Sequence, residues 1–461
     1  MNLQKHKPLI KRYPFFCSAV LLLGVLLFSC KKNTGEIKKP NPPQPPVSLA
    51  VVLKTADSTQ VIDETLSGPK EATRLAQNMP ASDFYTTGFY LPPGSEMKLE
   101  LTAINGSRLP KLLVGTYSRY NSFWNPNTYN LVTGINSITD ATGGILYFRF
   151  HNDSPDGKVQ IKFVSGMRPM PFFQLGKTTQ EDWVKMVDNI TNVPDVQLVG
   201  KKTIITFSLA NAKNNKTENQ EALVKKADRV IAIEDSISGL FGNDPMDQPN
   251  VHKYLLTETD NADYYMAATH YRSFYSMPSG GASAIFKADN FTWGPWHELG
   301  HMHQQGSWTW SELGEVTVNI YSIAVEKAFG ITPTRLTKDD EWSKAASYLA
   351  RLDAERDFNG SNASVWIRLC MFQQLKLAFG DSFYHDLHRQ ARKETNRPNN
   401  TDSRMKWFIL KASTISGKNL SGFFKKWGLK LSTTSATDAL YADLDKLGLP
   451  NPSTDLTLLK D

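Results

Sequence analysis

The chain has 461 residues, 40% of them hydrophobic and 11% aromatic, which is ordinary for a folded protein and allows about two or three domains. Its formal net charge is +7, but the first 47 residues hold eight basic residues against Glu36 alone, so the rest is formally neutral. No basic stripe with interleaved aromatic residues remains, and we therefore expect no nucleic-acid partner.

Residues 1–29 are predicted to be a lipoprotein signal peptide, because a basic segment precedes an apolar run at residues 15–28. That run is short for a membrane span, which needs about 20 residues. The sequence Leu27-Phe28-Ser29-Cys30 resembles a bacterial lipobox, so Cys30 is the predicted lipidation site. A non-lipidated secretory signal is the alternative. Residues 30–47 are rich in proline and are predicted to be an extended linker.

Residues 48–170 are predicted to form an antiparallel β-sandwich. Apolar and polar side chains alternate over residues 97–103 and 159–163, as expected for strands that bury one face. Asn105-Gly106 and similar pairs supply turns between short strands. The aromatic residues of this region are interpreted as sandwich core and rim rather than as a glycan-binding surface.

Residues 171–330 are predicted to be a zincin-like catalytic subdomain. Strands are expected at residues 203–207 and 251–257, with a helix at residues 218–241 between them. An extended peptide substrate can pair with the edge strand of such a sheet. We expect that edge at residues 282–286, which follow Gly280-Gly281.

The segment His297-Glu298-Leu299-Gly300-His301 carries the predicted chemistry. Histidines four residues apart on a helix project from one face, so both can bind a single zinc ion. Glu298 beside them is placed to act as a general base. A third ligand is still needed, and Glu315 on the next predicted helix is the candidate, with Glu312 as the competitor.

The donor that would stabilise the oxyanion stays open at this point. Four residues are candidates: His270, Tyr275, His303 and Tyr321. Residues 331–461 are predicted to be a helical subdomain, with helices at residues 342–358, 365–379 and 382–393. Cys370 is the one cysteine beyond Cys30, so it is interpreted as a buried apolar residue without a disulfide partner.

These motifs together resemble the M60 (enhancin-like) family of zinc metallopeptidases, a gluzincin group. The resemblance includes Gln304-Gln305 and residues 315–322 beside the histidine motif. Further similar segments lie at residues 87–94, 143–147, 173–183 and 423–428. The resemblance implies an α+β fold in which the N-terminal antiparallel β-sandwich belongs to the peptidase module, a thermolysin-like catalytic domain follows, and the C-terminal part is helical.

The same resemblance implies that His297, His301 and Glu315 bind one Zn²⁺ ion and that Glu298 is the catalytic acid/base. Members of the family act on mucins and other O-glycosylated proteins, often as surface lipoproteins of Bacteroidetes. We therefore expect a monomeric peptidase that cleaves glycoproteins and is anchored to the bacterial outer membrane through Cys30. The alternative is a surface lipoprotein that binds glycans or glycoproteins and has a non-catalytic metal site.

Overall fold

The structure is a computed structural model that describes residues 53–119 and 124–461. The predicted signal peptide, the lipidation site Cys30 and the proline-rich linker lie outside these residues. Within the two described ranges, no helix combines the length and the apolar character that a membrane span requires.

The N-terminal part is an antiparallel β-sandwich, as predicted. One sheet has the strand order β1-β8-β3-β6 and the other β5-β4-β7-β2-β9, and all neighbouring strands are antiparallel. The strands are β1 (Thr59–Asp63), β2 (Tyr85–Leu91), β3 (Glu96–Asn105), β4 (Lys111–Val114), β5 (Asn127–Asn130), β6 (Gly134–Thr139), β7 (Gly144–Arg149), β8 (Lys158–Ser165) and β9 (Arg168–Pro169). Helix α1 (Gly68–Leu75), which was not predicted, precedes β2 and is capped by the Ser67 hydroxyl.

The middle strand of the five-stranded sheet, β7, is buried on both faces. In β7, Leu146 and Phe148 face the interior of the sandwich, whereas Ile145 and Tyr147 belong to the core of the neighbouring six-stranded sheet. Strand side chains alternate between faces, so a run of four apolar residues fits only a strand that is covered on both sides. The sandwich and the sheet that follows it therefore share a hydrophobic core.

The six-stranded sheet is mixed, with the order β10-β11-β12-β13-β15-β14. Its β10/β11, β12/β13 and β13/β15 pairs are parallel, and its β11/β12 and β14/β15 pairs are antiparallel. The strands are β10 (Phe172–Gln174), β11 (Asp195–Val199), β12 (Thr203–Ser208), β13 (Tyr254–Thr259), β14 (Met266–Thr269) and β15 (Arg272–Ser276). The accompanying helices are α2 (Gln180–Asn189), α3 (Leu209–Asn214) and α4 (Gln220–Ile237). A mixed sheet with a helix across it was predicted here.

The expected edge strand at residues 282–286 is wrong. That segment lies in the 3₁₀ helix Gly281–Ile285, and Ala282, Ala284 and Ile285 are all buried. Gly281 approaches so closely that a Cβ atom there would lie 2.1 Å from the carbonyl oxygen of Tyr265, which leaves no room for a side chain. The edge strands of the sheet are β10 and β14, and β14, which pairs with β15, is the one that contacts α5.

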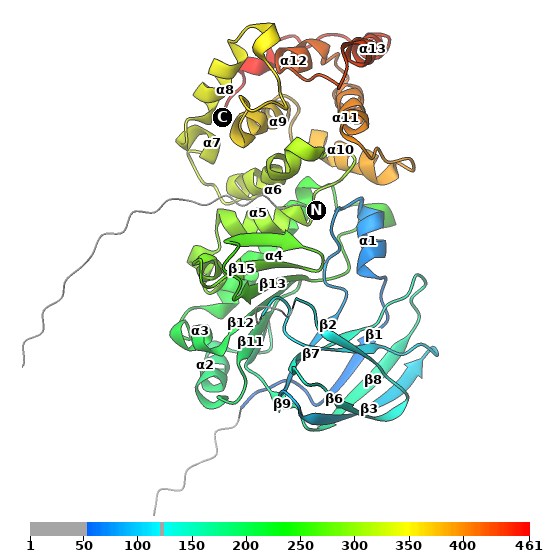
Figure 1. Ribbon diagram of the computed structural model, residues 1–461, viewed down its shortest axis with the longest axis vertical. Helices are drawn as coiled ribbons and strands as arrows, with labels where there is room; N and C mark the ends of the chain where they lie inside the picture. The colour runs from blue at the N-terminus through cyan, green and yellow to red at the C-terminus, as the bar shows by residue number, and fades with distance from the viewer. Residues whose placement is uncertain (1–52, 120–123) are drawn as a thin grey trace, which may run out of the picture. The chain divides into compact units, whose positions relative to one another are not determined.

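The C-terminal part is helical, as predicted. Its helices are α7 (Arg335–Lys338), α8 (Glu341–Leu349), α9 (Val365–Phe379), α10 (Asp381–Lys393), α11 (Thr401–Ser416), α12 (Ser421–Lys426) and α13 (Thr434–Asp445). Helix α8 ends well before residue 358, where the sequence pattern placed its end. Figure 1 shows α5 (Trp293–His301) and α6 (Gly314–Ala328) between the six-stranded sheet and these helices.

Helices α5 and α6 lie where two hydrophobic cores meet. From α5, Trp296 and Leu299 pack into the core of the six-stranded sheet. From α6, Val316, Ile320 and Ile323 pack into the core of the C-terminal helices. Both helices also reach the other core, because Val325 of α6 is buried in the core of the six-stranded sheet and Trp293 of α5 packs against both cores.

Candidate metal centre

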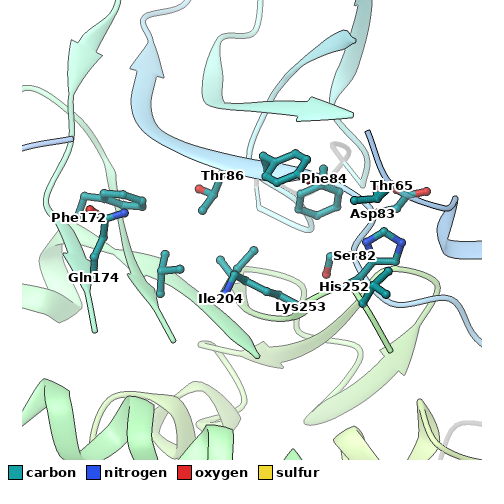
Figure 2. A pocket seen from close by; sticks show the side chains of 13 residues that line it. Thr65, Ser82, Asp83, Phe84, Thr86, Phe172, Gln174, Ile204, His252 and Lys253 are labelled. Atoms are coloured by element: carbon teal, nitrogen blue, oxygen red, sulfur yellow. The ribbon is translucent and has the colours of Figure 1, made fainter. Parts of the chain in front are cut away.

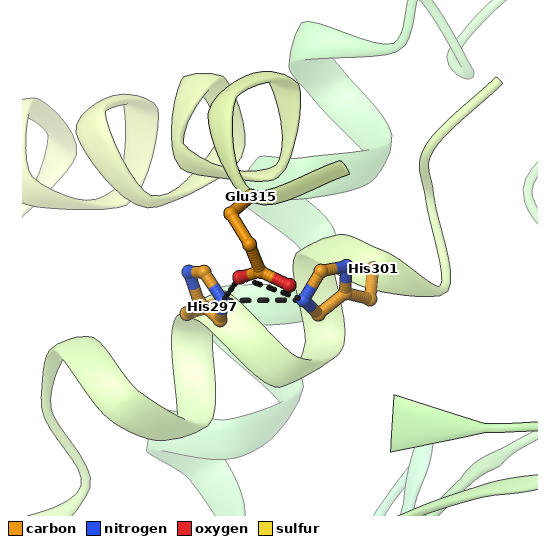
Figure 3. A group of neighbouring side chains, drawn as sticks. All are labelled: His297, His301 and Glu315. Atoms are coloured by element: carbon orange, nitrogen blue, oxygen red, sulfur yellow. Dashed lines mark hydrogen bonds and ion pairs between the residues drawn. The ribbon is translucent and has the colours of Figure 1, made fainter. Parts of the chain in front are cut away.

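The two histidines of the motif lie one turn apart on α5. Trp296 and Leu299 are buried on the opposite side of this short helix, so packing turns His297 and His301 to the side that faces α6. Figure 3 shows both rings converging below the start of α6, where the side chain of Glu315 descends toward them. The three predicted ligands thus come together from two helices.

A glycine permits the close approach of these helices. A Cβ atom on Gly300 would lie 2.9 Å from the carbonyl oxygen of Val318 and 3.3 Å from Cβ of Tyr321, both on α6. Any larger residue would therefore hold the helices further apart. The contact places the first turn of α6, which includes Glu315, next to the histidine pair.

The distances among the donor atoms suit a metal ion. Nε2 of His297 lies 3.1 Å from Nε2 of His301 and 3.0 Å from Oε2 of Glu315. Nε2 of His301 lies 3.6 Å from the same oxygen. Ligand atoms about 2.0–2.1 Å from a tetrahedral zinc ion stand about 3.3 Å from one another. Two imidazole nitrogens and one carboxylate, at these separations, fit a zinc ion with one coordination position left for water or substrate.

Glu312, the competing candidate for third ligand, is not part of this group. Among the described residues, the one cluster that could hold a metal consists of His297, His301 and Glu315. Glu312 lies in the turn before α6, and its charge acts instead on Arg368 of α9. The sequence did not decide between Glu312 and Glu315 as the third ligand, and the geometry favours Glu315.

Each histidine is also held at its other ring nitrogen. Nδ1 of His297 lies 2.8 Å from Oδ1 of Asn319, and Nδ1 of His301 lies 2.8 Å from Oε1 of Gln304. No role was predicted for these two amides from the sequence. Their spacing carried a signal, because Asn319 follows Glu315 by one helical turn and Gln304 follows His301 by three residues.

Glu298 lies beside the histidines and does not belong to the ligand group. Its side chain is buried, with 7% of the residue exposed, and among the residues described Oε2 has no hydrogen-bond partner. Burial raises the pKa of Glu298, while the neighbouring His301 and His297 lower it. A buried carboxylate without a fixed partner, next to a metal site, can accept and release a proton.

The four oxyanion candidates occupy different places. His303 is buried behind α5 between Glu234 and Asp235 of α4; burial alone would lower its pKa, but these carboxylates raise it to about 10. Tyr321 is also buried, with its hydroxyl 2.9 Å from the carbonyl oxygen of His303. Both residues therefore act as supports for the end of α5 rather than as oxyanion donors.

The other two candidates lie on the strands beside α5. Tyr275 of β15 is fully buried with its hydroxyl 3.0 Å from Oγ of Ser273, and burial followed by the charge of Glu298 raises its pKa well above the usual value. His270 is exposed in the turn between β14 and β15.

A separate cavity of about 230 Å³ lies between the sandwich and the six-stranded sheet (Figure 2). Phe84, Phe172 and Ile204 line it. Its charged groups are already bonded: Asp83 accepts a hydrogen bond from Arg149 at 2.7 Å. We interpret it as a packing gap at the junction of the two sheets.

Comparison with known proteins covers both parts of the fold. The family model described as peptidase M60, enhancin and enhancin-like, matches residues 166–428. The model described as the N-terminal domain of M60-like peptidases matches residues 66–164. TRPM8 channel-associated factor 3 of Rattus norvegicus is 25% identical over 401 residues, which cover 83% of this chain and 42% of that protein. The chain thus spans about two-fifths of the length of the curated relatives it matches.

Solved structures share the fold. A functionally unknown conserved protein from Bacillus anthracis str. Ames has a TM-score of 0.77 at 34% identity, over 87% of this chain and 81% of that one. The M60 catalytic domain from Clostridium perfringens ZmpC, in complex with the sialyl T antigen, has a TM-score of 0.73 at 18% identity, over 87% and 82%. A metallopeptidase in complex with Tn antigen has a TM-score of 0.73 at 17% identity, over 88% and 80%.

Proposed function

This chain belongs to the family of peptidase M60, enhancin and enhancin-like, and from that membership we propose that it is a zinc-dependent endopeptidase that hydrolyses peptide bonds in mucin-type O-glycosylated proteins. The observation that carries the proposal is the convergence of His297, His301 and Glu315 beside the unbonded carboxylate oxygen of Glu298. A site that only binds metal has no need of a base in that place.

The three ligands would hold one zinc ion, and Glu298 would accept a proton and later donate it. Bound there, zinc supplies a Lewis acid that polarises the scissile carbonyl and acidifies water. Glu298 accepts a proton from the attacking water at its carboxylate as the new carbon–oxygen bond forms. It then gives the proton to the amine nitrogen as the carbon–nitrogen bond breaks, so the carboxylate is regenerated.

Strand β14 is the proposed support for the substrate backbone. It is one of the two edge strands of the six-stranded sheet, and no other strand of the described residues pairs with its outer side, where an extended peptide would add. It also lies against α5, because a Cβ atom on Gly294 would come within 2.7 Å of Sδ of Met266. The side chains of Ala267 and Ala268 in this strand are small and half-buried.

The choice of O-glycosylated substrates rests on the structural relatives. The two peptidase structures named above contain the sialyl T antigen and the Tn antigen. The alternative, a surface protein that binds glycans or glycoproteins without cleaving them, is favoured by the name of the rat relative, which is a channel-associated factor rather than a peptidase. Glu298, in its position beside the ligands, favours cleavage.

We also propose that the chain is exported and anchored by a lipid at Cys30 to the bacterial outer membrane, and that it acts as a monomer. The support is the basic and apolar N-terminal segment followed by Leu27-Phe28-Ser29-Cys30. Cells grown with labelled palmitate should label the wild-type protein and leave Cys30→Ala unlabelled. A wild-type protein that takes up no label would contradict the lipid anchor.

The test of the peptidase uses a pair of peptides. One carries a single N-acetylgalactosamine on threonine, and the other has the same sequence without the sugar. We expect new peptide termini by mass spectrometry from the glycopeptide alone, loss of cleavage with a chelator, and recovery when zinc is added. Equal cleavage of both peptides would refute the glycan requirement. Zinc binding without cleavage of either would favour the binding protein.

A further inference from the structure

The hydrogen bonds around the two histidines give Asn319 and Gln304 a role beyond packing. We propose that these side-chain amides are positioning residues: they hold His297 and His301 in the tautomer that can bind the metal, and they join that pair to the first turn of α6. The inference rests on the proposed metal centre and assigns two residues to it that are not ligands.

The orientation of the Asn319 amide follows from its second contact. Its Nδ2 donates to the carbonyl oxygen of Glu315 at 2.8 Å, and a carbonyl oxygen can only accept. Oδ1 must therefore be the atom that faces His297, at 2.8 Å from Nδ1. Because Oδ1 also only accepts, Nδ1 of His297 must carry the proton. A neutral imidazole then presents its lone pair at Nε2, toward Glu315.

Gln304 orients the second histidine in the same way. Its Nε2 donates to the carbonyl oxygen of Gly314 and to Oγ1 of Thr317, both at 2.7 Å. Its Oε1 accordingly accepts from Nδ1 of His301 at 2.8 Å, which leaves the lone pair of His301 at Nε2. Each ring, in its neutral form, therefore has its lone pair on the Nε2 that faces Glu315.

The same amides connect the ligands across the two helices. Asn319 bonds the backbone of Glu315 itself, and the donor contacts of Gln304 are on Gly314 and Thr317, which flank Glu315 in the first turns of α6. The two amide side chains are buried, with 1% of Asn319 and 4% of Gln304 exposed. One hydrogen-bonded unit thus contains all three ligands and holds their relative positions.

Loss of either amide acceptor should lower the metal affinity of the site. Without it, Nδ1–H becomes a buried donor with no partner, or the proton moves to Nε2, where it competes with the metal. Replacement of residues that orient metal ligands typically lowers metal affinity about 10–100-fold. We expect a loss in that range for each amide.

Paired substitutions separate the acceptor from the donor. Asn319→Asp keeps an acceptor for His297 and loses the donor to Glu315, whereas Asn319→Leu has a similar shape and loses both. Gln304→Glu and Gln304→Met form the same pair for His301. The control is Gln305→Met, because Gln305 is equally buried but bonds Leu75, His388 and Trp308 instead of the ligands.

Two measurements decide the outcome. Zinc dissociation constants from competition with a chelator should rise about 10–100-fold in Asn319→Leu and Gln304→Met. They should stay within about threefold of the wild type in Asn319→Asp, Gln304→Glu and Gln305→Met. Nitrogen NMR of the zinc-free protein, labelled at histidine, should show proton-bearing Nδ1 in the wild type and a shift toward Nε2 in the leucine and methionine variants. Thermal unfolding identifies any variant that has not folded.

Several results would overturn the inference. Equal loss of zinc affinity in the acidic and apolar variants would make the amide donors the important groups, and the tautomer role would be wrong. Apolar variants that keep both the affinity and the Nδ1 tautomer would also refute it. The NMR measurement needs no metal, so it tests the inference even if the wild type binds no zinc. A wild type that binds no zinc would refute the proposed metal centre instead.

Discussion

Replacing Gly300 with alanine should weaken metal binding by separating two helices. The added Cβ would lie 2.9 Å from the carbonyl oxygen of Val318, 3.1 Å from its Cγ2 and 3.3 Å from Cβ of Tyr321. Carbon–oxygen contacts need about 3.4 Å, so α6 must move by about 0.5 Å relative to α5. All three atoms belong to α6, and no single side-chain rotation relieves the contact.

That displacement exceeds what a metal site tolerates. Ligand distances in such sites are held within about 0.2 Å, and Glu315 moves with α6 while both histidines stay on α5. We expect the zinc dissociation constant to rise at least about tenfold, which is about 1.4 kcal/mol. The net cost to folding is about 0–2 kcal/mol, because an overpacking cost of about 1–3 kcal/mol is offset by about 1 kcal/mol of better helix propensity.

Gly314→Ala is the matched control for this substitution. Gly314 begins α6, and a Cβ atom there meets no other atom within 4 Å. This variant should keep the zinc affinity of the wild type and gain up to about 1 kcal/mol of stability. Competition with a chelator gives the affinities of both variants under the same conditions. Equal affinity of the two alanine variants would refute the argument from helix contact.

Two further predictions concern other carboxylates. Glu315→Ala should release zinc on dialysis while Glu312→Ala retains it, measured as metal per chain; the opposite result would exchange the two assignments. Hydrogen bonds from the Arg108 guanidinium lower the pKa of Glu64 from 4.5 to about 2. The ion pair therefore stabilises the fold above about pH 4.5, and its contribution is lost as the pH falls toward 2. Thermal unfolding of Glu64→Gln in a pH series should show a smaller loss over that interval, and a curve parallel to the wild type would contradict this.

The candidate metal ligands could be grouped from the sequence because their geometry is mostly local. His297 and His301 share a face of any helix that contains them. For Glu315 to be the third ligand, a second helix had to lie close to the first, and Glu312 remained an alternative. The choice between the glutamates depends on where α6 begins and on the close contact at Gly300. Neither is visible from residue spacing alone.

The substrate edge could not be predicted because it is a property of topology. The strand at residues 266–269 is short and its side chains are half-buried. Nothing in its residue pattern marks it as the last strand of a sheet. Residues 282–286 are more apolar and resemble a buried strand by composition, but they pack as a 3₁₀ helix. Short apolar runs of this kind do not distinguish strand from helix by periodicity.

The sandwich shows a similar limit. Its strands and their antiparallel pairing were predicted from alternation and turns, as at residues 97–103. The run from Ile145 to Phe148 is continuously apolar, and its burial on both faces became clear only from the shared core. The roles of Asn319 and Gln304 likewise needed the structure, because each amide bonds groups on both helices of the metal centre.

The central claim is that Glu298, beside a zinc site, breaks peptide bonds in an O-glycosylated substrate. The most direct test compares the wild type with Glu298→Gln, both loaded with zinc, on one glycopeptide, with new termini identified by mass spectrometry. We predict that the wild type cleaves, and that the variant binds zinc equally well but cleaves at least about 100-fold more slowly. Cleavage by the variant at the wild-type rate would contradict the account.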